Sequence, residues 1–509
     1  MQWLDKVLDD VVSAHPEGEI TVSSGVSPSG VSHVGTLREV LTAEAIMLGL
    51  RIRGRDAVHI HNVDDLDPLR KIPAGVDPDF EKYMGMPLCD VPSPDGKAGS
   101  WADYYFKDFA ASAKKLGMDM QLLRMHKKYR TGFMVPAIEK VLDNIDKARD
   151  TLVKISGRQL DDNWSPIQIK EDDYLKKRRF LGIDDKAKTI RYEDKDGNPK
   201  EVSYAMGDVK LDWRLDWPAR WWLLGVDVEP FGRDHATKGG SYDTGVGLMK
   251  SIFKEKPPLP VPYNFIIRTG QTKKMSKSSG DTLAISDMLQ ILPPEVLRYF
   301  VLRYGPEKQL FFDETDGVVR LIDDFAALLA KAGKTPEDEM LIKLSMAGVP
   351  STTISNIPFS HLVASYQAAL KDPARTLEII RRTEHRQTVD DQQDIILQEL
   401  KFIDNWLKKW APEDVKFQLA TNPPKILEDK EISFLKSLAA KIQAAPADAD
   451  GEWFHKAIYE FKDTAGLAPK QLFGTLYKVL INQESGPRAG WFLSILPREW
   501  LIKRLRLEA

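Results

Sequence analysis

Apolar and polar positions follow two different periods along the first hundred residues of the chain. Segments 17–25 and 56–63 are short, apolar and rich in β-branched residues, which predicts strands. Between them, apolar residues recur at helical spacing, at Leu37, Val40, Leu41, Ala45 and Leu48. The order strand, Gly-rich turn, helix and strand predicts an α/β fold at the start of the chain.

The pattern changes after two helical segments at 100–118 and 133–155. Residues 161–208 are polar and charged, with strand-like runs on both sides of "DKDGNPK". This predicts a β-hairpin that turns at Asp196-Gly197, within an insertion. The α/β pattern returns with a strand that runs into a Gly-rich turn carrying Asp234 and His235. We therefore expect a sheet that is interrupted and then resumed.

The C-terminal part of the chain has a helical pattern. A helix is predicted near 293–307, and beyond about Pro350 no strand pattern remains. One apolar stripe at helical spacing predicts a core-facing helix surface, formed by Ile396, Leu400, Ile403 and Leu407.

Composition excludes several classes of protein. A chain of 509 residues exceeds the roughly 250–300 that one core supports, so we expect more than one domain. The net charge of −3 excludes a uniformly basic coat but leaves an RNA partner open. Cys89, the one cysteine, excludes an internal disulfide and fits a reducing compartment. The acidic N-terminus lacks a signal pattern, and no apolar run reaches the roughly 20 residues that span a bilayer, so we expect a cytoplasmic protein without membrane contact.

Two short motifs carry candidate chemistry. "GVSPSGVSHVGT" at 25–36 places a stretch rich in glycine and other small residues before a helix. The free backbone N–H groups at the start of such a helix attract an anion such as phosphate. "KKMSKSSG" at 273–280 places Lys274 and Lys277 three residues apart among small hydroxyl residues, suited to a triphosphate clamp. Taken singly, the first is equally well a tight turn with a surface His33, and the second a solvated loop.

The two motifs together, in this order, resemble the HIGH and KMSKS signatures of class I aminoacyl-tRNA synthetases. Three further stretches narrow the resemblance to the class I lysyl-tRNA synthetases over nearly the whole chain: "DDLDPLRKIP", "RLDWPARWWLLGVDVEPFGRDHATKGGSYDTG" and "GPRAGWFLSIL". The resemblance implies a Rossmann-type parallel-sheet catalytic domain split by an insertion, followed by an all-α anticodon-binding domain.

The domain boundaries follow from the patterns and the resemblance combined. We expect the first half of the catalytic domain at 1–100, the connective insertion at 101–208, the second half at 209–270, the KMSKS loop and stem-contact region at 271–348, and the helical anticodon-binding domain at 349–509.

The resemblance also implies a reaction. Lysine is activated with ATP to lysyl-adenylate, and the lysyl group passes to the terminal ribose of tRNA(Lys). L-lysine, ATP with its Mg²⁺ and tRNA(Lys) are then the expected partners of a monomeric enzyme. Thr36 stands where the family signature has a second His, and its hydroxyl can still donate a hydrogen bond.

Site residues are transferred from the family motifs position by position. The expected catalytic residues are His33, Thr36, Lys274 and Lys277. The expected ATP-binding residues are Pro28, Gly30, His33, Gly35, Gly232, Asp234, Met275, Ser276 and Lys277. The expected lysine-binding residues are Gly25, Ser27, Trp213, His235 and Tyr263.

Several of these residues have a structural alternative. Asp234 can bind ribose hydroxyls or cap a helix, and His235 can line the lysine pocket or pack in a core. The aspartates that follow the second strand can be pocket carboxylates or caps: Asp64, Asp65 and Asp67.

The sequence also allows predictions about metal binding and about the residues that contact tRNA. Members of the family often carry cysteine-based zinc motifs in the insertion, but residues 161–208 contain no cysteine and no histidine. We therefore expect no zinc and no resident metal site. The candidates for base stacking are Trp453, Phe454, Phe473 and Tyr477, and those for phosphate contact are Arg488, Lys503, Arg504 and Arg506. Core packing and a solvated terminal helix are the respective alternatives.

Two other functions remain as alternatives. A tRNA-binding relative without catalysis would be expected to lose the signature lysines. A Rossmann nucleotidyltransferase acting on a small metabolite would not need about 150 residues of helical C-terminal domain.

Overall fold

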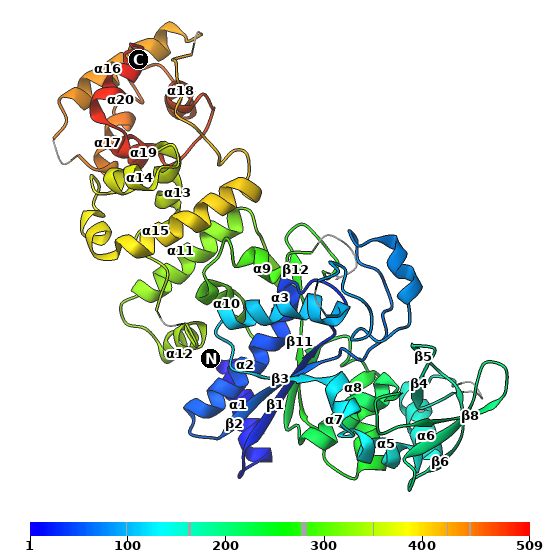
Figure 1. Cartoon of the computed structure of the whole chain (residues 1–509). Coiled ribbons are helices and arrows are strands. Elements are labelled where there is room, and N and C mark those ends of the chain that lie inside the picture. The colour runs from blue at the N-terminus through cyan, green and yellow to red at the C-terminus, as the bar shows by residue number, and fades with distance from the viewer. Residues whose placement is uncertain are drawn as a thin grey trace. The chain divides into compact units, whose positions relative to one another are not determined.

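The chain folds into two compact units (Figure 1). The computed structural model describes residues 1–97, 99–160, 164–275, 282–349, 351–424, 426–446 and 449–508. Unit 1 comprises Met1–Leu289, Leu297–Phe312 and Gly333–Pro350, and unit 2 comprises Gln290–Val296, Asp313–Ala332 and Ser351–Ala509. These compact units differ from the functional domains expected from the sequence, whose boundaries stay predictions.

Unit 1 is built on a five-stranded sheet in the order β11-β10-β1-β2-β3. All four neighbouring pairs are parallel. The strands are β1 (Ile20–Val26), β2 (Ala57–Val63), β3 (Gln121–Arg124), β10 (Val228–Gly232) and β11 (Leu259–Tyr263). Strand β1 therefore pairs on one side with β2, which precedes the insertion, and on the other side with β10, which follows it. The predicted α/β fold with an interrupted parallel sheet is confirmed.

The predicted helix is confirmed as α2 (Leu37–Ile52), which is buried on nearly every side. It packs against β1, β2, β10 and α1 (Gln2–Ala14), a helix that the sequence analysis did not predict. A Cβ on Gly49 would lie 2.8 Å from Leu8 of α1, which shows how closely the two helices approach. Polar residues of α2 are buried as well, and they need internal partners.

Arg38 is the buried cation of α2, with 1% of its surface exposed. Its guanidinium donates hydrogen bonds to the backbone oxygens of Val301 at 2.6 Å, Tyr304 at 3.3 Å and Lys308 at 3.0 Å, and also to that of Gly305. These carbonyls lie at the end of α10 (Pro294–Leu302) and in the turn after it. One side chain therefore fixes this turn against α2.

The insertion contains helices and two small antiparallel sheets. Its helices are α3 (Trp101–Lys115), α4 (Met125–Arg130), α5 (Val135–Leu142) and α6 (Ile145–Ser156). One sheet has the order β5-β4-β9 and the other β6-β7-β8. Their strands are β4 (Ile167–Glu171), β5 (Tyr174–Lys176), β6 (Arg179–Asp184), β7 (Thr189–Glu193), β8 (Pro199–Ser203) and β9 (Val209–Leu211).

The predicted hairpin is confirmed as the β7–β8 pair, which is antiparallel with Glu193 opposite Pro199. Gly197 in its turn has a φ of +82°, a conformation that favours glycine. The rest of unit 1 comprises α7 (Trp213–Leu224), α8 (Ser241–Leu248), α9 (Ile285–Met288), α12 (Pro336–Ser345) and the parallel pair β12 (Ile266–Arg268) and β13 (Leu310–Phe312).

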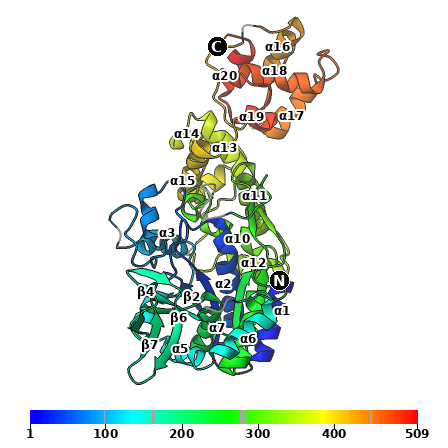
Figure 2. The same cartoon turned by 90° about the vertical axis from the view of Figure 1, so that its right-hand side faces the viewer.

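The regular secondary structure among the described residues of unit 2 is all helical (Figure 2). Its helices are α11 (Asp316–Ala330), α13 (Phe359–Ala368), α14 (Pro373–Ile380), α15 (Arg386–Lys409), α16 (Asp429–Gln443), α17 (Gly451–Tyr459), α18 (Pro469–Ile481), α19 (Ala489–Ile495) and α20 (Arg498–Leu505). The predicted stripe on α15 is confirmed, since its four residues are at most 3% exposed. No helix in the described part of the chain is both long and apolar enough to span a membrane.

Some residues considered for tRNA contact pack inside unit 2 instead. Phe454 and Tyr477 are buried in its core. Arg504 is 2% exposed and donates to the backbone oxygens of Ala420 and Thr421. Core packing, the structural alternative, therefore accounts for Phe454 and Tyr477. Arg504 is buried, so the solvated terminal helix that was its alternative is wrong at this position. Trp453 and Phe473 are only partly buried, and Arg488 lines a surface cavity.

The hydrogen bonds of Arg38 lead to a stability prediction. We expect the Arg38→Met variant to unfold several degrees below the wild-type protein, because hydrogen bonds to a charged group contribute about 1.5–3 kcal/mol each and the carbonyls would lose them. Scanning calorimetry measures the shift. Arg51→Met is the matched control, since Arg51 forms an ion pair with Asp119 in which the two side chains are 41% and 69% exposed. Equal shifts in the two variants would contradict the role of Arg38.

Candidate active site

The two sequence motifs come together in the structure. The backbone N–H of Val34 donates to the oxygen of Leu283 at 3.0 Å, and that of Ile285 donates to the oxygen of Ser32 at 3.1 Å. His33 and Ala284 form an antiparallel bridge between these bonds. The chain that follows the second motif is therefore paired with the first motif, at the carboxyl end of β1.

One cavity at this edge of the sheet gathers eight of the expected site residues. It is lined by Gly25, Val26, Ser27, His33, Gly35, Thr36, Glu39, Tyr263, Phe265, Ile266, Lys274 and Met275. Pro28 and Gly30 are buried in the loop of the first motif. Ser276 and Lys277 lie outside the described residues. Because ligands of open parallel sheets bind at this edge, the cavity is the candidate active site.

Glu39 is a lining residue that the sequence analysis missed. Its two carboxylate oxygens accept hydrogen bonds from the Tyr263 hydroxyl at 2.6 Å and from the backbone N–H of Gly25 at 2.8 Å. A glutamate in the first turn of a helix is usually a partner of the helix dipole, so it does not stand out. The available signal was its place three residues after Thr36, which puts both on one helix face.

The surroundings of Glu39 change its protonation. Burial raises the pKa of Glu39 to about 7, against the opposing effect of its hydrogen bonds from Tyr263 and Gly25. The nearby carboxylates Glu229 and Asp64 raise it further. Burial and the Glu39 charge raise the pKa of Tyr263 well above its usual value, so its hydroxyl stays a donor. A carboxylate held in this way gains from a cationic ligand, which makes Glu39 a candidate binding group.

Asp234 lies just beyond β10, next to the cavity. Lys274 Nζ lies 2.8 Å from Asp234 Oδ2 and 4.5 Å from the centre of the Phe265 ring. Burial acts to raise the pKa of Asp234, but the hydrogen bond from Lys274 and the nearby His235 lower it overall. Helix α8 begins at Ser241 with Gly240 as its N-cap, so Asp234 does not cap it.

At two motif glycines, a neighbouring side chain occupies the space where a Cβ would lie. A Cβ on Gly232 would lie 2.6 Å from Asp234 Oδ1, and one on Gly35 would lie 2.8 Å from the His33 ring. Both distances are shorter than real Cβ contacts. Glycine at these positions therefore lets Asp234 and His33 adopt their observed orientations.

Trp213 and His235 belong to a separate aromatic cluster. The Trp213 ring centre lies 5.4 Å from both His235 and Trp217. Trp217 donates from its indole N–H to the Glu229 carboxylate at 3.2 Å, and Ser23 donates to the same carboxylate at 3.3 Å. Burial lowers the pKa of His235, which leaves its ring neutral at pH 7. The expected lysine-binding residues thus form two groups, of which only Gly25, Ser27 and Tyr263 line the cavity.

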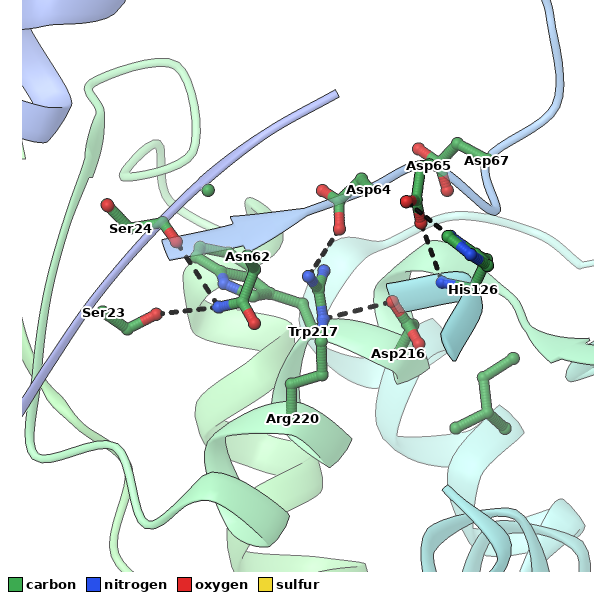
Figure 3. A network of polar contacts seen from close by, with 12 residues as sticks. Ser23, Ser24, Asn62, Asp64, Asp65, Asp67, His126, Asp216, Trp217 and Arg220 are labelled. Atoms are coloured by element: carbon green, nitrogen blue, oxygen red, sulfur yellow. Dashed lines mark hydrogen bonds and ion pairs between the residues drawn. The ribbon is translucent and has the colours of Figure 1, made fainter. Parts of the chain in front are cut away.

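The three aspartates after β2 are partners in ion pairs and do not line the cavity. Figure 3 shows the contacts of Asp64 with Arg220 and of Asp65 with His126. Asp64 lies 2.6 Å from Arg220 Nη1. Asp65 pairs with Arg124 and accepts a hydrogen bond of 2.7 Å from the backbone N–H of His126, at the start of α4. The third pair is Asp67 with Lys210, at 3.1 Å.

Asp216 of α7 joins two of these pairs, Asp64–Arg220 and Asp67–Lys210, into one buried network. Its carboxylate lies 3.2 Å from Arg220 Nε and 3.7 Å from Lys210 Nζ, and it accepts a hydrogen bond from Tyr129. Burial opposes ionisation, but Lys210 and Arg220 lower the pKa of Asp216 below its usual value. The network connects the end of β2 to α4, β9 and α7. It therefore anchors the insertion to the edge of the sheet.

Comparisons with known proteins agree on one family. The profile of the family described as "tRNA synthetases class I (K)" matches residues 1–346. The chain is 34% identical over 534 residues to a lysine–tRNA ligase of Methanosarcina barkeri, covering 99% of this chain and 97% of that protein. It is 33% identical over 510 residues to the lysine–tRNA ligase of Archaeoglobus fulgidus, with 99% of each covered. Identity to the Pyrococcus horikoshii enzyme is 31% over 522 residues, with 100% of each chain covered.

The raised pKa of Glu39 predicts a pH dependence of stability. The folded state holds this proton up to about pH 7, whereas the unfolded chain releases it near 4.5. Wild-type stability should therefore fall as the pH rises from about 4.5 to about 7, and above pH 7 this loss is complete and no longer changes with pH. Glu39→Gln removes this loss, so its stability relative to the wild type should be higher by about 2 kcal/mol at pH 8 than at pH 5. Urea unfolding at both pH values measures the difference.

The exposed Glu17 provides the control for this experiment. Glu17→Gln removes the same charge without altering a buried site, so its stability relative to the wild type should barely change with pH. If Glu39→Gln behaved like this control, Glu39 would be an ordinary ionised carboxylate.

Proposed function

The chain belongs to the class I tRNA synthetases and, among them, to the lysine–tRNA ligases; from this we propose how its residues divide the reaction between them. The enzyme activates lysine with ATP to lysyl-adenylate, releasing pyrophosphate. It then transfers the lysyl group to the 3′-terminal ribose of tRNA(Lys), releasing AMP. The observation that carries the proposal is the single cavity that joins both signature motifs to the Glu39–Tyr263 pair.

Glu39 and Tyr263 bind the ε-ammonium group of lysine in this proposal. The ammonium is a compact charge with three donors, and it suits a carboxylate and a phenolic oxygen that lie 2.6 Å apart. Its charge also restores the ionised form of Glu39, whose pKa burial has raised. The planar guanidinium of arginine is wider and would leave donors unpaired, which favours lysine.

The backbone and the aromatic cluster complete the proposed lysine site. Gly25 donates to Glu39 and presents no side chain, and a Cβ there would lie 3.3 Å from the backbone oxygen of Asn62. Ser27 is a polar lining residue. Trp213 and His235 supply an aromatic wall for the apolar stem, with their rings tilted at 35° to each other. Their neutral surface suits the methylene groups.

The phosphates of ATP are assigned to the two signature motifs. His33 and Thr36 donate to phosphate oxygens, and Lys274 and Lys277 compensate the negative charge that grows in the transition state. ATP binding is also assigned to Pro28, Gly30, Gly35, Met275 and Ser276. Mg²⁺ enters with ATP as part of the substrate and neutralises phosphate charge.

Asp234, beside Gly232 at the end of β10, receives the ribose hydroxyls of ATP. In the structure its carboxylate is paired with Lys274 at 2.8 Å. Since both groups are assigned to ATP, nucleotide binding exchanges this ion pair for contacts with ribose and phosphate. Unit 2 is the proposed site of anticodon contact. A monomeric state and a cytoplasmic location stay predictions.

The ammonium site predicts a change confined to lysine. Glu39→Gln should raise KM for lysine about 10- to 100-fold, because the variant loses one hydrogen bond to a charged group. KM for ATP should stay unchanged. Steady-state aminoacylation with each substrate varied in turn measures both constants. Trp213→Ala tests the aromatic wall in the same assay. A variant that raised both constants equally would be a packing residue rather than a lysine contact.

The phosphate site predicts a loss in the activation step. His33→Ala and Lys277→Ala should each slow ATP–pyrophosphate exchange about 10²–10³-fold, because each removes a donor to developing phosphate charge. Assays with tRNA(Lys) present ensure that activation is not limited by its absence. Lys273→Ala is the matched control, since Lys273 is exposed and stands beside the signature lysines. If Lys277→Ala catalysed ATP–pyrophosphate exchange at the wild-type rate, the proposed role of Lys277 would be wrong. If lysine did not stimulate exchange by the wild-type protein, the proposed function would be wrong.

A further inference from the structure

Three potential metal ligands converge in unit 2. His361 comes from the first turn of α13, and Glu384 and His385 come from the turn that leads into α15. His361 Nδ1 lies 3.4 Å from His385 Nε2, which in turn lies 3.5 Å from Glu384 Oε1. All three ligand atoms lie within 4.8 Å of one another. Helix α13, which carries His361, packs against α15, whose first residue follows His385, and α14 contacts both helices (Figure 2).

We propose that His361, Glu384 and His385 form a binding site for a divalent transition-metal ion, with Zn²⁺ as the best fit. Zinc binds imidazole nitrogens at about 2.0–2.1 Å in tetrahedral geometry, which places two such nitrogens about 3.3–3.4 Å apart. The observed separation of His361 Nδ1 from His385 Nε2 has this value. Two imidazoles and one carboxylate are also a ligand set that zinc uses when water occupies its fourth position.

The ligand side chains are held by their surroundings. The His361 ring stacks on Trp491 with centres 4.2 Å apart and planes 19° apart. The backbone N–H of His385 donates to the hydroxyl of Thr383 at 3.2 Å, which fixes the turn before α15. Preorganised ligands lose less conformational freedom on binding an ion. Only small movements of Glu384, whose side chain is 52% exposed, are needed to complete the set.

Local charge also favours a cation. His361 and Glu384 line a surface cavity that gives an ion access. The carboxylates of Glu384, Asp450 and Glu452 line this cavity, against the single guanidinium of Arg488 among its described lining residues.

The proposal departs from the sequence-based expectation of no resident metal. That expectation rested on the missing cysteines and on residues 161–208, where zinc motifs occur in the family. The present ligands come from two segments separated along the chain, and their spacing matches no zinc motif. A bound ion would join the start of α13 to the turn before α15. Because it binds only the folded arrangement, it would stabilise unit 2.

The test uses the untagged full-length chain after treatment with a chelator. Isothermal titration with ZnCl₂ should show one ion per chain, and thermal unfolding should shift upward with ZnCl₂. Co²⁺ should bind at the same site and give the intense visible absorption of a four-coordinate ion. His361→Gln and His385→Gln should each weaken zinc binding at least about 10-fold. Removing a residue that only hydrogen-bonds to a metal ligand already causes a loss of this size, so removing a ligand should cost at least as much.

The choice of variants keeps the result interpretable. His455→Gln is the matched control, because His455 lines the same cavity but is not one of the three ligands, so it should bind zinc as the wild type does. His385→Gln leaves the stack of His361 on Trp491 intact, and circular dichroism verifies the fold of each variant. The proposal is overturned if the wild type takes up no ion, or if the His361/His385 double variant binds as tightly as His455→Gln.

Discussion

The arrangement of the active site depends on the pairing of β1 with strands from both halves of the sheet. β1 pairs with β2 on one side and with β10 on the other, although some 160 residues of the insertion and its flanks separate those two strands along the chain. This junction brings the carboxyl ends of β1 and β10 to one edge. The bonds between residues 32–34 and 283–285 then add the second motif. The insertion must therefore return the chain accurately, and the network around Asp216 and Arg220 provides the anchoring that this requires.

Local sequence patterns predicted the elements whose structure is determined locally. The strands β1, β2 and β10, the β7–β8 hairpin and the stripe on α15 all follow from periodicity and turn residues. Helix α2 was predicted as a helix, but its burial depends on α1 and on three strands, which periodicity does not report. For the same reason Arg38 has the appearance of a surface residue in the sequence, yet it is buried against distant carbonyls.

The residues of the candidate site also differ in whether the sequence alone could predict them. Motif residues could be recognised because their spacing along the chain is constrained by the loop that they form. Glu39 could not, because its partners Tyr263 and Gly25 are 224 and 14 residues away, and its raised pKa arises from burial among those distant segments. Asp64 and Asp67 also needed the fold, since their partners Arg220 and Lys210 are more than 140 residues away along the chain. His361 and His385 are 24 residues apart and share no recognisable motif.

The path of the chain between the compact units determines how the protein can be divided experimentally. Residues Asp313–Ala332, which contain α11, belong to unit 2, yet the following Gly333–Pro350 returns to unit 1. The indole N–H of Trp406 in α15 donates to the backbone oxygens of Glu314 and Thr315, just before α11. A fragment starting at residue 349 would lack these partners and expose the surfaces of α13 that α11 covers. An autonomously folding C-terminal fragment thus has to begin upstream, or carry α11 as a grafted segment, because no single cut separates the two compact units.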